Sequence, residues 1–372
     1  MRDLQNDSSS SNAGFLAQLP SRPVSTDDMD DRAEIAYYRE AIVAGKPSWK
    51  PLLDALELFQ RFIYPAFNEE DQLALKFQSR YMLASIGAVS MGAFTVCLAI
   101  GQLATHGTAL ANYWAKGLEI TEIVAAAFTF LIVVIAIAFR PKEKWLTSRF
   151  KAEALRVFKF NKLCDPRLWT GHSTDRSHLE RDLRAEIAEL RRKTLHDAED
   201  WATQGTVPWV NKVSVSAKCG DAQDEFVRYY RAKRPEAQMS YLERKARQRE
   251  AQGTFWGFVL QILFWWSLAF VLGHAGLSLG GGKEWTSNLF IAWAAILPVA
   301  AGAVRTYKSS REFERNAARH EATLFILEKL ATRLDCSSSC EESFATIGFC
   351  EQILEADSRE WMRLMVSAEW YG

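Results

Sequence analysis

The sequence predicts an all-α integral membrane protein with two transmembrane helical hairpins and a cytoplasmic helical bundle. Three observations lead to this fold class. Four apolar stretches are almost free of charged residues, the charged remainder has apolar residues at helical spacing, and basic residues cluster on one side of the apolar stretches. The overall values, 48% hydrophobic residues and a mean hydropathy of -0.14, hide this division because they average over both parts.

Each of the four apolar stretches is long enough to cross a bilayer as a helix. The predicted transmembrane segments are 82–104, 118–139, 253–272 and 288–305. The first has 23 residues without Asp, Glu, Lys or Arg, and at about 1.5 Å per residue such a helix crosses a hydrocarbon core of about 30 Å. The fourth is the shortest, and we expect Arg305 to snorkel and complete it. A buried soluble core is the alternative, but such cores rarely supply four stretches of this kind.

The basic residues predict the orientation of these segments. Fifteen Lys and Arg residues lie within twelve residues of the inner ends of the segments, whereas the hairpin connections hold only Lys116 and Lys283. By the positive-inside rule the connections face outward, and both termini and the middle of the chain are cytoplasmic. No cleavable signal peptide is expected, because the N-terminal residues are polar and rich in serine.

The two hairpins have the spacing of an internal duplication. A shift of 168 residues lays 83–104 on 251–272 and 118–139 on 286–307, with connections of equal length. A Tyr-Tyr-Arg triplet precedes each hairpin. We interpret the chain as two tandem copies of one unit. The predicted divisions are a disordered tail at 1–25, a first unit at 26–203, a linker at 204–221 and a second unit at 222–372.

The soluble parts have the apolar periodicity of helices. Residues 178–202 place apolar residues along one face of a single predicted helix. Asn68, followed by three acidic residues, is predicted to cap a helix that runs directly into the membrane. The acidic run from Asp27 to Asp31 is expected to decorate the first turn of another helix, and a cation site is the alternative.

Several residues of the predicted membrane segments are candidates for packing or gating. Ala84, Ala88 and Gly92 recur every four residues and predict a smooth face for close helix packing, with chance composition as the alternative. Pro298 lacks a backbone donor and predicts a kink, either a harmless bend or a gate hinge. Gln261 is the deepest strong hydrogen-bonding side chain, and we expect it to be buried in an interhelical hydrogen bond rather than to line a pore.

Two acidic residues lie one turn apart at the outer end of the second segment, Glu119 and Glu122. In an oligomer they would form an acidic ring at the mouth of a pore. The alternative is a pair of solvated carboxylates near the membrane interface.

The sequence gives little support for an enzyme. It contains no Gly-rich phosphate loop, no Gly-x-Ser-x-Gly elbow and no His-Glu-x-x-His motif. Cys336, Cys340 and Cys350 lack the paired spacing of a zinc site, so we expect reduced thiols. We therefore predict no catalytic residue, cofactor or metal. Equal numbers of basic and acidic residues, 45 each, argue against nucleic acid as a partner.

Two groups of residues around the second hairpin carry a resemblance to a known family. Ahead of the third segment stand Tyr230, Arg234, Gln238, Tyr241 and Lys245-Ala246, and near the end stand Glu351, Ile353, Leu354, Glu355 and Arg359-Glu360-Trp361. This pattern resembles the SLATT family, the SMODS and SLOG-associating two-transmembrane effector domains of bacteria. A weaker version occurs in the first half, at Asp71–Ala74 and Glu199–Trp201.

The resemblance implies a bacterial inner-membrane effector. Such a protein would oligomerise and form a pore or disrupt the membrane when it is activated in a conflict or antiphage defence system. The implied partners are the lipid bilayer, further copies of the chain, and a sensor or nucleotidyltransferase encoded nearby, because no nucleotide-sensing domain is recognisable in the sequence. The alternative function is a non-enzymatic membrane scaffold or signalling adaptor that presents a cytoplasmic helical bundle.

Overall fold

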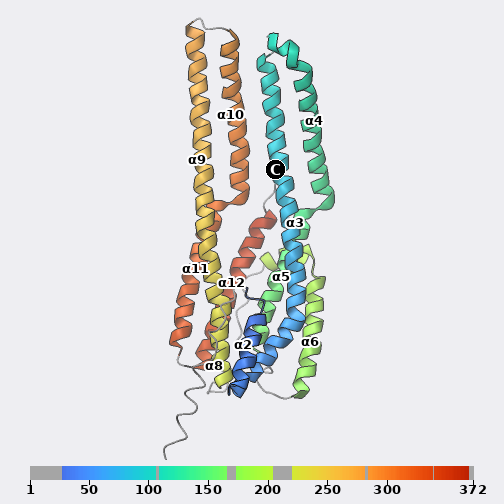
Figure 1. Ribbon diagram of the computed structural model, residues 1–372, viewed down its shortest axis with the longest axis vertical. Coiled ribbons are helices and arrows are strands. Elements are labelled where there is room, and N and C mark those ends of the chain that lie inside the picture. The colour runs from blue at the N-terminus through green and yellow to red at the C-terminus, as the bar shows by residue number, and fades with distance from the viewer. Residues whose placement is uncertain are drawn as a thin grey trace, which may run out of the picture. The chain divides into compact units, whose positions relative to one another are not determined.

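The computed structural model describes residues 27–105, 109–165, 173–203, 220–280, 284–337 and 339–367, and within these ranges it is helical without any strand (Figure 1). The elements are α2 Arg32–Val43, the 3-10 turn η1 Pro47–Trp49, α3 Lys50–Thr105, α4 Ala109–Phe139, α5 Pro141–Leu163, α6 Ser173–Arg192, α7 Leu195–Thr203, α8 Asp221–Arg231, the π-helical turn η3 Ala232–Glu236, α9 Ala237–Leu279, α10 Glu284–Arg311, α11 Phe313–Cys336 and α12 Cys340–Ser367. The predicted all-α fold class is confirmed. The predicted N-terminal tail and all but the last two residues of the predicted linker lie outside the described residues.

The chain divides into two compact units. Unit 1 consists of Met1–Ala74, Leu146–Glu243 and Glu321–Val366. Unit 2 consists of Leu75–Trp145, Arg244–His320 and Ser367–Gly372. The helices α3 and α9 each contribute one end to unit 1 and the other end to unit 2. Each unit thus combines residues from both halves of the sequence.

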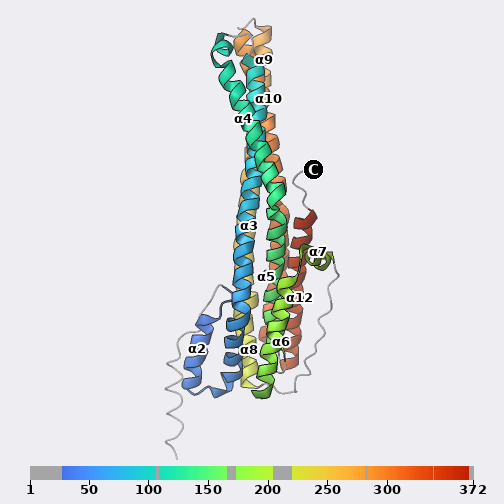
Figure 2. The same ribbon diagram turned by 90° about the vertical axis from the view of Figure 1, so that its right-hand side faces the viewer.

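Unit 1 is a helical bundle with one hydrophobic core, in which α5, α6, α8 and α12 accompany the first part of α3 (Figure 2). The first part of α3 places Leu52, Leu56, Phe59 and Ile63 on one face at helical spacing, and all four are buried. Side chains from the other helices pack into the same core: Leu155, Phe160, Leu183, Phe226, Leu327 and Ile347.

The start of α3 differs from the prediction. Asn68 does not cap a helix, because α3 begins at Lys50 and continues through Pro65 and Asn68. A proline inside a helix costs about 3 kcal/mol. Burial of one large apolar side chain contributes about 1.5–3 kcal/mol, so the four core residues that precede Pro65 offset this cost. The prediction that this helix runs into the membrane segment is confirmed by the candidate span Pro47–Ala104.

Residues 178–202 form two helices and not the predicted single one. The break lies at Lys193 and Thr194, between α6 and α7. The Asp197 carboxylate accepts hydrogen bonds from the backbone amide of Thr194, at 2.6 Å, and from its hydroxyl, at 2.7 Å. Such local side-chain bonds compete with the helix interior and favour a helix start.

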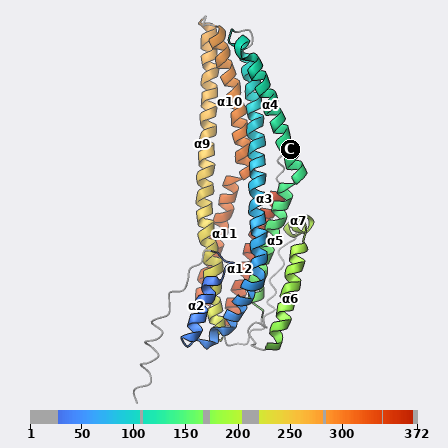
Figure 3. The same cartoon turned by 45° about the vertical axis from the view of Figure 1, so that its right-hand side comes forward.

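Unit 2 contains the two hairpins. The helices α3 and α4 run side by side, as do α9 and α10 (Figures 1 and 3). Four helical stretches are long and apolar enough to cross a membrane, which confirms the four predicted segments by length and composition. At most 6% of the most apolar window in each stretch is buried. Most of the apolar side chains in these windows are therefore available to lipid.

Each hairpin ends at a single residue with a left-handed backbone. Arg140, between α4 and α5, and Glu312, between α10 and α11, both have a φ of 44°. Residues other than glycine seldom adopt this conformation, which costs roughly 1–2 kcal/mol. It ends the membrane helix at these points and starts a new helix directly, with Pro141 at the first position of α5, where its missing amide hydrogen is tolerated.

Candidate functional site

The second hairpin has a cross-helix hydrogen bond at its proline. Pro298 cannot donate to the carbonyl of Ala294, four residues earlier in α10. The hydroxyl of Ser267 on α9 donates to that oxygen at 3.2 Å. A serine from the neighbouring helix therefore satisfies the carbonyl that the proline leaves free, as expected where no water is available.

The outer end of the same hairpin is closely packed. A Cβ atom added at Gly273 on α9 would lie 2.4 Å from the ring of Phe290 on α10, so only glycine allows this approach. Phe270 packs edge-on against Phe290, with ring centroids 5.4 Å apart. Further out, the Ser287 hydroxyl and the Nδ1 atom of His274 share a hydrogen bond of 2.9 Å. These contacts fix the register of α9 against α10.

The predicted packing residues of the first hairpin, Ala84, Ala88 and Gly92, are half-buried. A Cβ atom at Gly92 would lie 4.0 Å from the methyl group of Thr129 on α4, an ordinary contact distance. Gly87 is more tightly placed, since its added Cβ would lie 3.4 Å from Ile132. The side of α3 that carries these glycines thus faces α4, and the packing role of the small residues stays a prediction.

Gln261 is exposed and makes no hydrogen bond from its side chain within the described part of the chain, in contrast to the buried position that we predicted. The ammonium of Lys308 on α10 lies next to Gly257 on α9, because a Cβ atom there would be 3.7 Å from it. Gln261 follows Gly257 by about one helical turn. The role of Gln261 within a membrane stays a prediction.

The predicted pore-mouth residues lie on α4, where Glu119 is exposed and Glu122 half-buried. Neither carboxylate forms an ion pair within the described chain. Their role at a pore stays a prediction.

Unit 1 contains a buried ionic network that centres on Arg234. The guanidinium of Arg234 makes two hydrogen bonds to the carboxylate of Glu351 on α12, at 3.0 and 3.1 Å. It also donates to Asp28 at 2.8 Å, and the Tyr230 hydroxyl donates to Glu351 at 2.8 Å. Arg234, Asp28 and Glu351 are at most 6% exposed. Three segments far apart in the sequence are therefore joined through one side chain.

Two buried lysines extend the network to the segment that precedes α2. Lys159 on α5 forms an ion pair with Asp31 at 2.7 Å and donates to the backbone carbonyl of Asp28 at 2.8 Å. Lys233 pairs with Glu34 at 2.8 Å and donates to the carbonyls of Asp27 and Asp30, at 2.9 and 2.6 Å. Both ammonium groups thus hold the backbone of residues 27–31 as well as its carboxylates.

The π-helical turn η3 explains why Lys233 and Arg234 point inward together. In a regular α-helix, neighbouring side chains diverge by about 100°. Lys233, Arg234 and Pro235 are nevertheless all buried. Pro235 has no amide hydrogen, and the wider turn brings three consecutive residues to one side. Such π-bulges occur often at functional sites.

The acidic run at residues 27–31 has a different role from the one predicted. The helix α2 begins at Arg32, so these residues precede its first turn. Asp28 and Asp31 are buried, and protein cations occupy their surroundings. Within the described residues there is no group of three or more side chains suited to hold a metal ion. The network therefore contains its own counter-ions.

The charges of the network shift the pKa values of its members. Burial raises the pKa of Asp28, but the cations Arg156 and Arg234 outweigh this effect and lower it to about 2. Burial raises the pKa values of the Tyr229 and Tyr230 hydroxyls, and neighbouring carboxylates add to the rise. The carboxylate of Asp28 is therefore ionised at neutral pH, whereas both tyrosines stay protonated and donate hydrogen bonds.

The cysteines only partly follow the expectation of reduced thiols. Cys336 and Cys350 are free, whereas Cys340 is in a disulfide. Burial raises the pKa of the Cys350 thiol to about 12, which makes it a poor nucleophile at neutral pH.

Sequence reasoning missed Lys159 and Lys233, and it singled out Asp31 only as part of the acidic run, without its lysine partner. One signal was present for Lys159, because it lies four residues after Leu155 and four before Leu163, both fully buried on α5. A lysine on an apolar stripe of this kind needs a buried partner. No comparable signal exists for Lys233, since its direction depends on the π-helical turn.

Comparison with known proteins identifies one family. Residues 230–361 match the sequence model of the SMODS and SLOG-associating 2TM effector domain 1 family. The resemblance inferred from the sequence is confirmed for this stretch, which begins at Tyr230 of the network and ends at Trp361 on α12. Neither the curated proteins nor the solved structures gave a match.

Proposed function

We propose that this chain is a bacterial membrane effector in which the cytoplasmic unit controls membrane permeability through the hairpins. The observation that carries the proposal is the match of residues 230–361 to a family of effector domains, because this stretch includes a complete membrane-capable hairpin. The continuous helices α3 and α9 support the coupling, since each contributes residues to both units.

In this proposal the ionic network holds the resting state. Arg234 contacts the segment that precedes α2 through Asp28 and the helix α12 through Glu351. Removing one partner of a buried ion pair costs about 3–5 kcal/mol. A trigger that displaces either segment must supply free energy of this order. The network would then act as a threshold against accidental activation.

Permeation in this proposal requires several copies of the chain, because four membrane helices enclose little space for water. Glu119 and Glu122 would line the outer mouth and concentrate cations there. Pro298 would act as the hinge of α10, and the Ser267 hydroxyl would hold the closed bend through the Ala294 carbonyl.

The remaining features of the proposal follow the sequence. The protein would lie in the inner membrane with both termini in the cytoplasm, would act without catalytic residues, cofactor or metal, and would respond to a sensor or nucleotidyltransferase encoded nearby.

Cysteines introduced at Thr108 and Gly281, in the two hairpin connections, should react with an impermeant reagent from outside in a cysteine-free background. Labelling only from the cytoplasmic side would contradict this orientation.

We also propose that the chain arose from two tandem copies of one unit. The positions of the two left-handed residues support this. Arg140 follows the membrane helix of the first hairpin and Glu312 that of the second, and a charged helix starts directly after each. Glu312 lies 172 residues after Arg140, four residues more than the shift of 168 that aligns the hairpins. Such a backbone feature is rare, so its occurrence after the second membrane helix of each hairpin favours duplication over chance.

The experiment that tests the effector function uses the full chain expressed in bacteria with a membrane-potential dye. Glu351→Gln keeps the size of the side chain but removes the charge that pairs with Arg234. We expect this variant to depolarise cells at an expression level at which the wild type does not. Glu341→Gln is the matched control, because Glu341 is exposed on the same helix.

A properly inserted Glu351→Gln protein that leaves the membrane potential intact would contradict the proposed control by the network. If the wild-type chain together with its neighbouring gene product also produced no ion flux, the scaffold alternative would be favoured.

A further inference from the structure

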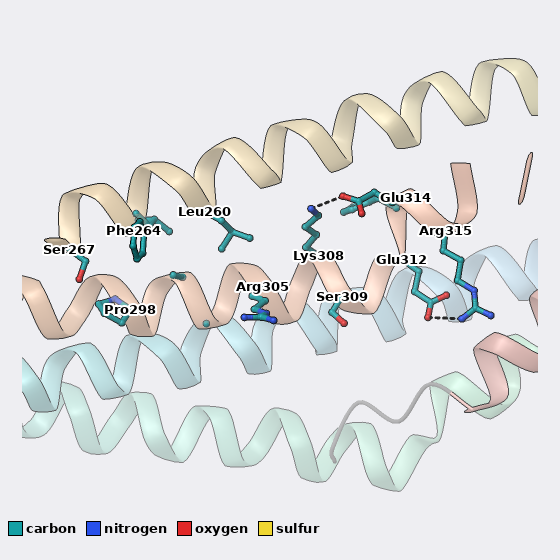
Figure 4. Close-up of a pocket in the computed structure, with 14 residues that line it drawn as sticks. Leu260, Phe264, Ser267, Pro298, Arg305, Lys308, Ser309, Glu312, Glu314 and Arg315 are labelled. Carbon is teal, nitrogen blue, oxygen red and sulfur yellow. Dashed lines mark ion pairs between the residues drawn. The ribbon is translucent and has the colours of Figure 1, made fainter. Parts of the chain in front are cut away.

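Unit 2 contains a cavity of about 900 Å³ between α9, α10 and the first turn of α11 (Figure 4). One end of the cavity has apolar walls, formed by Leu260 and Phe264 on α9 and by Pro298 on α10. The other end has charged walls, which α10 and the start of α11 provide. The residues of that end are Arg305, Lys308, Ser309, Glu312, Glu314 and Arg315.

The change from apolar to charged walls occurs where the membrane span ends. Gly302 is still within the charge-free stretch of α10, which ends at Val304, and Arg305 is the first charged residue after it. In a bilayer the apolar end of the cavity would lie among acyl chains, and the charged end would lie at the level of the headgroups. The cavity thus has the same polarity gradient as a lipid molecule.

The ion pairs at the charged end leave one cation available. Lys308 pairs with Glu314 at 2.8 Å, and Arg315 lies 3.8 Å from Glu312 (Figure 4). Arg305 is exposed and forms no ion pair within the residues that the structure describes. Its guanidinium lines the cavity at the boundary between the two ends.

We propose that this cavity binds one anionic phospholipid. An acyl chain would lie along Leu260, Phe264 and Pro298, and the phosphate would accept hydrogen bonds from Arg305 and from the Ser309 hydroxyl. Arginine suits this task because its planar group can donate two parallel hydrogen bonds to a phosphate. The volume is within the usual range for ligand pockets, about 300–1,000 Å³. The proposal requires membrane insertion but does not depend on pore formation.

The test compares lipid binding by the full chain in mixed detergent micelles, measured by native mass spectrometry with equimolar phosphatidylglycerol and phosphatidylcholine. We expect the wild type to retain phosphatidylglycerol preferentially. Arg305→Gln should lower this preference about tenfold, the effect of losing one strong charge-assisted contact. Arg140→Gln is the matched control, because Arg140 also follows directly after a membrane helix but lies outside the cavity.

A second variant tests the apolar end without changing any charge. A Cβ atom at Gly302 would meet no other atom within 4 Å. Gly302→Leu should therefore fold and fill the cavity, and retention of both lipids should fall. Equal preference for phosphatidylglycerol in the wild type and Arg305→Gln, or unchanged retention in Gly302→Leu, would overturn the proposal. Displacement of the lipid by inorganic phosphate alone would assign the site to a free anion instead.

Discussion

Replacing Ser267 by alanine tests whether α9 supplies the hydrogen bond that Pro298 denies to α10. In the wild type the Ala294 carbonyl accepts from the Ser267 hydroxyl at 3.2 Å. Ser267→Ala leaves this carbonyl without a donor inside an apolar stretch. Pro298→Ala restores the amide hydrogen of the helix itself, so the carbonyl then has a donor whether or not the serine is present.

The expected magnitude follows from the length and the surroundings of this bond. At 3.2 Å it is longer than the usual O–H to O distance of about 2.5–3.0 Å. Hydrogen bonds between membrane helices contribute about 0.6 kcal/mol on average and about 1.7 kcal/mol at most. We expect Ser267→Ala to lower the free energy of unfolding by about 1 kcal/mol, and to have almost no effect in the Pro298→Ala background.

The assay is reversible unfolding in mixed micelles with increasing sodium dodecyl sulfate, followed by tryptophan fluorescence. It compares the wild type, Ser267→Ala, Pro298→Ala and the double variant. Ser90→Ala is a suitable control, because Ser90 is exposed on α3 and makes no hydrogen bond from its side chain within the described residues. Equal destabilisation by Ser267→Ala in both backgrounds would show that the proline and the serine are not coupled.

Three further predictions concern other parts of the chain. Gly273→Ala should destabilise the second hairpin by about 1–3 kcal/mol, because the added methyl group meets the ring of Phe290. Gly276→Ala should not, because its added methyl group meets no atom within 4 Å. Thermal unfolding measures both variants, and equal stability of the two would refute the close approach. Glu119→Gln combined with Glu122→Gln should lower cation over anion permeability in liposomes, and unchanged selectivity would remove these residues from the pore. Asp28 has a pKa of about 2 in the fold against an ordinary 3.8, so its ion pairs contribute about 2–3 kcal/mol above pH 3.8 that are lost as the pH falls toward 2. The difference in unfolding free energy between the wild type and Asp28→Asn should therefore narrow over that pH range, and a constant difference would contradict this.

The four membrane-spanning segments could be predicted from the sequence because each depends only on a run of consecutive residues. A stretch such as 82–104 has no charged residue over a length that spans a bilayer, and no distant residue can alter that property. The match of Tyr230, Arg234 and Glu351 to a family pattern also identified residues of the network before their contacts were known. Their spacing in the sequence could not show that the Glu351 carboxylate accepts hydrogen bonds from both Tyr230 and Arg234.

The parts that escaped prediction depend on contacts between distant segments. In a regular α-helix Lys233 would be a surface residue, but the π-helical turn directs it inward. The hydrogen bond from Ser267 to Ala294 depends on the register of α9 against α10, which the connection between them does not determine from sequence. The exposure of the Gln261 side chain likewise depends on how α9 packs against its neighbours, which the sequence of α9 alone does not determine.

The ionic network shows that the stretch that matches the family is not the part of the chain that folds as one unit. The stretch that matches the family, 230–361, contains Lys233, Arg234 and Glu351. The buried partners Asp28, Asp31 and Glu34 all lie about two hundred residues earlier, outside this stretch. A fragment cut at the family boundary would bury Lys233 without its carboxylate, and an unpaired buried cation is strongly destabilising. A chimaera that exchanges the second half for that of a relative would meet the same obstacle. A change of charge in one half of the network can therefore be accepted only together with a compensating change in the other half. The two halves of the chain must for this reason evolve together.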